Sequence, residues 1–170
     1  LSLHDALPIS EVIVPIRLAP LGQYQDLNSR NVVSVNGNFE YSIRVQEPLK
    51  LITAVGGQSA YSQAAVLQIF SGRMLNGLRK LVGKRAANAP MLSIVSNADS
   101  EQLSQELTEF SRAELLASGV ALSRIFDLTL ELDPESLSQL REFGRQESNL
   151  AIQSKGAQIA NQQGFAEVNI

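Results

Sequence analysis

The sequence predicts an α+β fold. Two stretches, Val32–Val45 and Val120–Leu132, alternate apolar and polar residues along most of their length, which is the period of a half-buried β-strand. Between them, apolar residues recur every three or four positions over about Ser62–Arg85, which predicts a long amphipathic helix. With 170 residues and 44% apolar composition, the chain fits one domain with its own core, or one domain with an appendage.

The N-terminal half begins with strands. Glu11–Leu18 is rich in β-branched residues, and its Pro15 predicts an edge strand or two short strands. Pro20–Arg30 carries Pro, Gly, Asn and Asp, which predicts a loop in which Gln23–Gln25 could be extended. In the strand that follows, the Asn36-Gly37 pair fits either a bulge within one long strand or a type I′ hairpin turn. The apolar face of that strand carries Val33, Val35, Phe39, Tyr41, Ile43 and Val45.

Helix signals fill the middle of the chain. Glu47-Pro48 can open a short helix over Leu49–Val55. Met91–Val95 is too short to assign. Asp99 is a plausible N-cap with Gln102 at N3, and Gly119 ends the helix that follows. The expected apolar positions are Leu67, Phe70, Met74, Leu78 and Leu81 in the long helix and Leu103, Leu107, Phe110 and Leu115 in the next.

The last strand leads into a helical arm. Asp133-Pro134-Glu135 combines an N-cap, a proline at N1 and an acidic first turn. Ala151–Gln163 either continues a long helical arm or is frayed. In the strand over Val120–Leu132, Arg124 interrupts the alternation and indicates a bulge. The residues expected on one face of that strand are Val120, Leu122, Phe126, Leu128, Leu130 and Leu132.

Residues 1–10 match one translated reading frame of a common sequencing adapter. We expect them to be a fused, non-native segment, with a native N-terminal extension as the alternative. The one histidine of the chain, His4, lies in this segment. Without it and Asp5, the acidic count falls from 17 to 16 against 14 basic residues, so the net charge changes from −3 to −2. We also expect a shortened natural N-terminus and a truncated C-terminal arm.

Composition disfavours several classes of function. The absence of cysteine excludes disulfides and thiolate metal sites. With His4 set aside, a serine nucleophile has only carboxylates and lysines as bases, so we expect no catalytic, cofactor or metal site, and a small-ligand enzyme is the minor alternative. The net negative charge and the lack of aromatics among the basic residues disfavour nucleic-acid binding. Apolar runs are far shorter than the roughly 20 residues that cross a bilayer.

The charge distribution predicts one candidate site. Between Gln58 and Ala98 there are five basic residues and no acidic one. Of these, Arg73, Lys80 and Lys84 fall on one flank of the predicted long helix, about 120° from its apolar stripe. The ordinary interpretation is a solvated face that is partly paired with the acidic helix over 99–114. The functional interpretation is a contact with anionic lipid or with the acidic helix of a neighbouring protomer.

Two segments carry a family resemblance. Gly37-Asn38-Phe39-Glu40-Tyr41-Ser42-Ile43-Arg44-Val45 with Glu47-Pro48, and Gly119-Val120 through Asp133-Pro134-Glu135, occur in an order and spacing that resemble the SPFH (Band 7) superfamily of stomatins, prohibitins and flotillins. The nearest branch is the bacterial one described as virion-core-protein-like. Glu47 stands where the family usually has aspartate. The resemblance covers about Val12 to Arg145.

The resemblance implies an SPFH-like domain over 11–133, with a small, mainly antiparallel sheet and packed amphipathic helices, followed by a C-terminal helical arm over 134–170. It further implies a non-enzymatic homo-oligomer that organises membrane microdomains or partner proteins, cytoplasmic and peripheral to the membrane. A soluble structural or stress-associated assembly protein of the same fold is the alternative.

Overall fold

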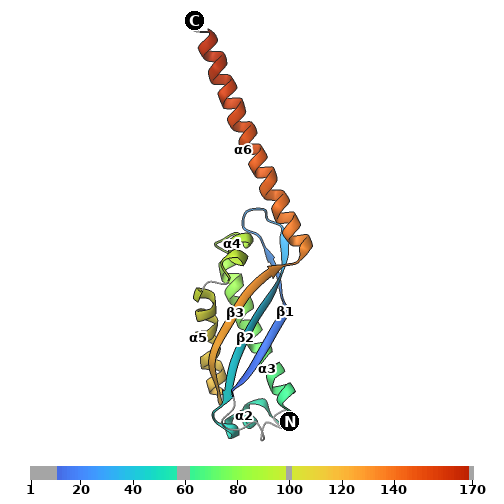
Figure 1. Ribbon diagram of the computed structural model, residues 1–170, viewed down its shortest axis with the longest axis vertical. Helices are drawn as coiled ribbons and strands as arrows, with labels where there is room; N and C mark the ends of the chain where they lie inside the picture. The colour runs from blue at the N-terminus through green and yellow to red at the C-terminus, as the bar shows by residue number, and fades with distance from the viewer. Residues whose placement is uncertain (1–10, 57–61, 99–100, 169–170) are drawn as a thin grey trace. The chain divides into compact units, whose positions relative to one another are not determined.

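The fold is α+β, as predicted. The structure, a computed structural model, describes residues 11–56, 62–98 and 101–168, with side chains described as far as Gln153 (Figure 1). The chain divides into two compact units between Asp133 and Pro134. The first unit holds an antiparallel sheet of order β1-β2-β3. Its elements are β1 (Val12–Gln25), β2 (Val32–Val45), α2 (Pro48–Val55), α3 (Gln63–Ala86), α4 (Met91–Ser96), α5 (Glu101–Ala117) and β3 (Val120–Leu132).

Strand β1 is longer than the sequence predicts. It forms the edge expected from Pro15 and continues through Pro20 to Gln25. The loop prediction is therefore wrong for Pro20–Gly22, whereas the extended conformation considered for Gln23–Gln25 is confirmed. The register against β2 shifts between Ile16 and Ala19 and again between Pro20 and Gly22. Pro20 lies directly beside the second shift, and both Pro15 and Pro20 are in an edge strand, where proline is tolerated. At the first shift Leu18 has φ 47°, and its N–H donates to Asn38 Oδ1 at 2.7 Å.

Strand β2 is one continuous strand, so Asn36-Gly37 is not a hairpin turn. Gly37 lies opposite Ala19 of β1 and Leu130 of β3. A Cβ at Gly37 would stand 3.2 Å from a methyl of Leu78, so the glycine lets α3 approach the sheet closely. The predicted apolar face is confirmed, because it is buried at Val33, Val35, Phe39, Tyr41 and Ile43.

Strand β3 departs from simple alternation at two places. Arg124 pairs with Ser42 and Leu122 with Ile43, which leaves Ser123 as an extra residue and confirms a bulge beside Arg124. A second irregularity at Asp127, with φ 56°, lies between the pairs with Glu40 and Asn38. The first bulge places Ile125 in the core and pairs Phe126 with Glu40 on the opposite face, and the second irregularity returns Leu128 to the core. The prediction of Phe126 on the core face is therefore wrong.

Helices α3, α4 and α5 cover one face of the sheet (Figure 1). Ser62 caps α3 by accepting a hydrogen bond from the Ala65 N–H at 3.3 Å. The Tyr41 hydroxyl ties β2 to α3 through Ser71 Oγ at 2.7 Å. Phe110, expected in the core, has 44% of its surface exposed, and its ring packs against Gly77, where a Cβ would lie 2.8 Å from it. The buried helix positions are Val66, Phe70, Met74, Gly77, Leu78 and Val82 in α3 and Leu103, Leu107, Ser111 and Leu115 in α5.

The second unit is a single helix, α6 (Pro134–Val168). It begins at the predicted proline with Glu135 in its first turn and continues through Gly144, where the apolar pattern weakens. The helical interpretation of Ala151–Gln163 is therefore confirmed. The predicted cap at Asp99 and the adapter-like residues 1–10 lie outside the described residues.

Candidate functional site

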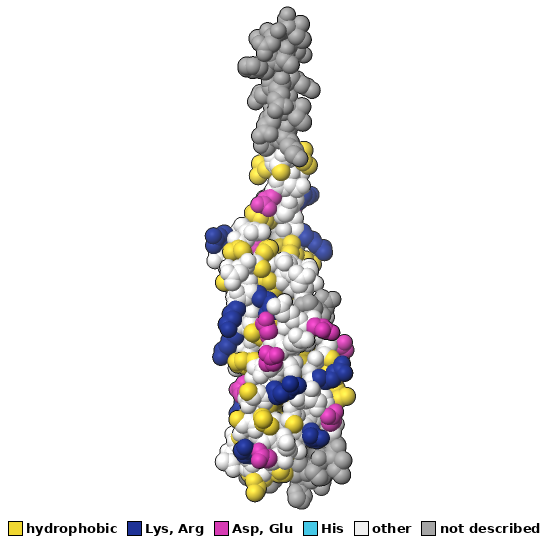
Figure 2. Space-filling model, turned by 90° about the vertical axis from the view of Figure 1, so that its left-hand side faces the viewer, with side chains coloured by type: hydrophobic (Ala, Val, Ile, Leu, Met, Phe, Trp, Pro, Cys, Tyr) yellow, Lys and Arg dark blue, Asp and Glu magenta, His cyan; other side chains and the backbone are white. Residues whose placement is uncertain are grey.

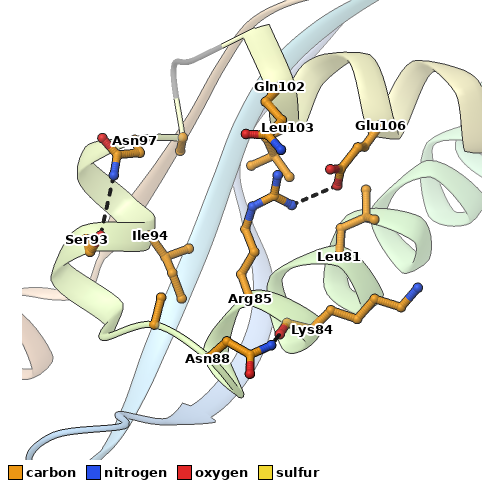
Figure 3. Close-up of a pocket in the computed structure, with 12 residues that line it drawn as sticks. Leu81, Lys84, Arg85, Asn88, Ser93, Ile94, Asn97, Gln102, Leu103 and Glu106 are labelled. Carbon is orange, nitrogen blue, oxygen red and sulfur yellow. Dashed lines mark hydrogen bonds and ion pairs between the residues drawn. The ribbon is translucent and has the colours of Figure 1, made fainter.

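A groove lies where the end of α3, helix α4 and the start of α5 meet (Figure 3). Its volume is about 450 Å³, within the roughly 300–1,000 Å³ of ligand pockets. Apolar side chains of Leu81, Ile94 and Leu103 line it, and each comes from a different helix. The polar lining consists of Lys84, Arg85, Asn88, Ser93, Asn97, Gln102 and Glu106. The groove thus combines an apolar surface with charged and carboxamide groups.

An ion pair crosses the groove between α3 and α5. Arg85 Nη1 lies 3.0 Å from Glu106 Oε2, and both side chains are partly exposed, so the pair contributes at most about 1 kcal/mol (Figure 3). The lysine next to it in sequence, Lys84, is exposed. Sequence reasoning missed the groove because one wall is α4, whose six residues are too few to show a helical period.

Buried Asp26 holds helix α4 in place. Asp26 Oδ1 accepts the Met91 N–H at 2.8 Å, at the first residue of α4, and Oδ2 accepts the Ser29 N–H at 2.8 Å. Burial by itself raises the pKa of this carboxyl, but the hydrogen bonds from Met91 and Ser29 outweigh it, and the net pKa lies below its usual value. The sequence signal was Asp26-Leu27-Asn28-Ser29, an Asx-turn pattern.

The structure does not present the three predicted basic residues as one free patch. The Arg73 guanidinium is half-buried, donates to Ser118 Oγ at 3.0 Å and lies 5.7 Å from the Phe70 ring centre. Lys80 Nζ lies 5.9 Å from the Phe110 ring. Lys84 is exposed at the groove. Figure 2 shows basic and acidic side chains close together on this side of the molecule, which agrees with partial pairing between α3 and α5.

The other end of the sheet carries an exposed apolar tip, formed by Leu49 and Ile52 of α2. Leu49 has 81% of its surface exposed and Ile52 38%, whereas Leu51 between them is buried and anchors the helix. The carbonyl of Gly119 accepts the N–H groups of Gln46 and Glu47, both at 2.9 Å, just before α2 begins. The α2 tip is therefore held on a fixed helix.

A further cluster joins the three strands at that end of the sheet. The Glu11 carboxylate accepts the Ser123 hydroxyl at 2.6 Å and the Ser42 hydroxyl at 3.1 Å. These hydrogen bonds, from Ser123 first and Ser42 second, lower the pKa of Glu11. Because both partners are hydroxyls that stabilise the carboxylate, the cluster has the chemistry of a structural link between strands.

The described residues also limit what this part of the chain can bind. Among them, no group of three His, Asp or Glu side chains lies close enough together to hold a metal ion. None of the described helices combines the length and the apolar character that a membrane span needs. No protein-family model matches the chain, and comparison with curated proteins gives no significant match.

Proposed function

We propose that this protein is a non-enzymatic, self-associating scaffold of the SPFH type, which organises membrane microdomains or partner proteins at a membrane surface. The observation that carries the proposal is helix α6. Its 35 residues correspond to about 52 Å at 1.5 Å per residue, and it forms a unit by itself. Long helices are stabilised mainly by packing an apolar surface against a neighbour, so α6 is suited to association between copies.

The exposed side chains of α6 support this proposal. Leu150 and Ile152 each have 65% of their surface exposed. Two residues apart on a helix, they point about 200° from each other, so one neighbour cannot cover both. More than one neighbouring helix would bury them, as in an assembly larger than a dimer. The order of strands and helices in the first unit is compatible with the family resemblance.

Size-exclusion chromatography with light scattering tests self-association directly. We expect the full chain to elute as an oligomer, and a Leu150→Glu, Ile152→Glu double variant to lose mass, because carboxylates oppose burial between helices. Gln146→Glu together with Gln153→Glu, at two exposed positions of α6, is the matched control for added charge. A monomer at all concentrations would rule out the scaffold.

A soluble assembly protein of the same fold is the second candidate, and the engagement of Arg73 favours it. With Arg73 bound to Ser118 and Arg85 to Glu106, fewer positive charges face solvent than the sequence suggests. Replacing Arg73, Lys80 and Lys84 with glutamine tests the membrane role. If this flank contacts lipid, flotation with phosphatidylserine vesicles at low salt weakens, by about 1 kcal/mol for each basic residue near the surface. Unchanged flotation argues for the soluble alternative or for another contact.

A further inference from the structure

The first unit carries an apolar projection and an apolar hollow at opposite ends. The α2 tip follows the end of β2, whereas the groove lies beside α4, which is bonded to Asp26 next to the start of β2 (Figure 1). The 14 residues of β2 span about 46 Å at roughly 3.3 Å per residue, so one molecule cannot bring the two together. A second copy can.

The two surfaces are complementary in chemistry. The tip presents Leu49 and Ile52, with Glu47 and Lys50 beside them as an ion pair of 3.0 Å. The groove presents the half-buried Leu81 near Lys84 and Glu106, while Ile94 and Leu103 form its buried floor (Figure 3). The groove carries two basic groups, Lys84 and Arg85, and one acidic group, Glu106, which is already paired with Arg85. Lys84 is therefore the exposed charge at the groove that Glu47 of the tip can face.

We propose that the α2 tip of one copy docks in the groove of the next copy, head to tail. This inference rests on the proposed self-association and names one of its contacts. Such a contact is heterologous, so it repeats from copy to copy and builds a ring or a filament. Because it buries a small area, it acts together with the association of α6, which raises the effective concentration of tip and groove.

The alternative occupant of the tip is a lipid surface. Exposed leucine and isoleucine on a short helix also suit a membrane interface. Because Glu47 and Lys50 offset each other, the tip has no net positive charge to attract a negatively charged membrane, and Glu47 suits the basic side of the groove. The concave, partly charged groove would have no role in a membrane contact of α2. The charges of both surfaces thus favour a second copy.

Two variants of the full chain test the contact. Leu49→Glu disables the tip, and Lys84→Glu places a second carboxylate opposite Glu47; both side chains are exposed, so the fold is retained. Leu18→Glu, at an apolar side chain with 59% exposure on β1, is the control. Light scattering should show at least a tenfold weaker association for Leu49→Glu and Lys84→Glu, and wild-type behaviour for Leu18→Glu.

Mixing the two variants gives the sharper measurement. A Leu49→Glu copy keeps its groove and a Lys84→Glu copy keeps its tip, so one contact can form in each mixed pair. The mixture should therefore have a mean mass above that of either variant alone and below that of wild type. Glu47→Lys combined with Lys84→Glu in one chain should restore association, because the charges are exchanged.

The outcomes separate this inference from the proposed function. If the wild type is monomeric, self-association itself fails. If the wild type assembles and Leu49→Glu assembles equally well, the tip-and-groove contact is wrong while the scaffold stands. If Leu49→Glu keeps its mass but no longer floats with phosphatidylserine vesicles, the tip is a membrane contact and the inference is overturned. An equal loss of mass in Leu18→Glu would also refute it.

Discussion

Replacing Asp26 with asparagine should destabilise the fold by about 2–3 kcal/mol. Asparagine has the same shape but only one acceptor oxygen, whereas the Met91 and Ser29 N–H groups each use a different carboxylate oxygen at 2.8 Å. One N–H is then left facing an NH₂ group in a site where Asp26 is only 3% exposed. A lost hydrogen bond to a charged group costs about 1.5–3 kcal/mol. We expect the upper part of that range, because the variant also leaves a buried N–H donor without a partner.

Urea denaturation measures this loss. With a slope of about 1–3 kcal/mol per molar urea, the midpoint should fall by roughly 1 M or more. Asp127→Asn is the matched control, because Asp127 is exposed and its positive φ is one that asparagine tolerates. Equal midpoints for wild type and Asp26→Asn at pH 7 would refute the hydrogen-bonding argument.

The pH dependence gives a second check on Asp26. Because folding lowers its pKa, its contribution is fully present above the usual aspartate pKa and is lost as the pH falls through the folded pKa. The free-energy difference between wild type and Asp26→Asn should therefore be constant above about pH 5 and shrink below about pH 4. Glu11, whose pKa is also lowered, is present in both proteins, so its effect cancels. A gap that stays constant to pH 3 would contradict the mechanism.

Three further substitutions test the packing. Gly72→Ala should stabilise the protein by about 0.5–1 kcal/mol in thermal unfolding, because a Cβ there meets nothing within 4 Å. Gly77→Ala should lose this gain, since its Cβ would lie 2.8 Å from the Phe110 ring. Equal effects of the two substitutions would refute the close α3–α5 packing. Gly119→Ala should cost roughly 3 kcal/mol or more, because φ is +80° and the new Cβ would overlap the Glu47 carbonyl; a loss below 1 kcal/mol would contradict this. Tyr41→Phe should cost about 1 kcal/mol through its hydrogen bond to Ser71, and an unchanged urea midpoint would refute that contribution.

Period and capping signals predicted most elements of the fold. Strand β2, helix α3 and the starts of α2 and α6 lie within a residue or two of their expected bounds, because alternation, helical spacing and X-Pro pairs act locally. The predictions for Phe126 and for Pro20–Gly22 failed for different reasons. The bulge at Ser123 moves Phe126 to the other face until the irregularity at Asp127 restores the alternation, and the sequence pattern does not show where a bulge begins. The Pro and Gly of Pro20–Gly22 predicted a loop, but this segment pairs with Asn36 and Val35 of β2, which are distant in sequence.

The candidate surfaces were harder to predict than the fold. Charge counting along the chain found Arg73, Lys80 and Lys84, but it could not show that Arg73 reaches Ser118, 45 residues away. The groove is built by three helices, and its position depends on how α4 is fixed. The exposure of Leu49 could not be predicted either, because the sequence of a short apolar helix does not show which of its leucines, Leu49 or Leu51, enters the core.

The two ends of the first unit are each fixed by one joint between sheet and helix. Asp26 binds the start of α4 at the groove end, and Gly119 binds the chain before α2 at the tip end. The proposed contact needs both surfaces to be preformed, since ordering them at binding would cost side-chain and loop entropy. Asp26→Asn should therefore weaken association even without urea, where the variant is still folded. The loss should exceed the one that the small unfolded fraction explains. If the association constant of Asp26→Asn falls only in proportion to its folded fraction, the hydrogen bond from Met91 to Asp26 does not contribute to the tip-and-groove contact.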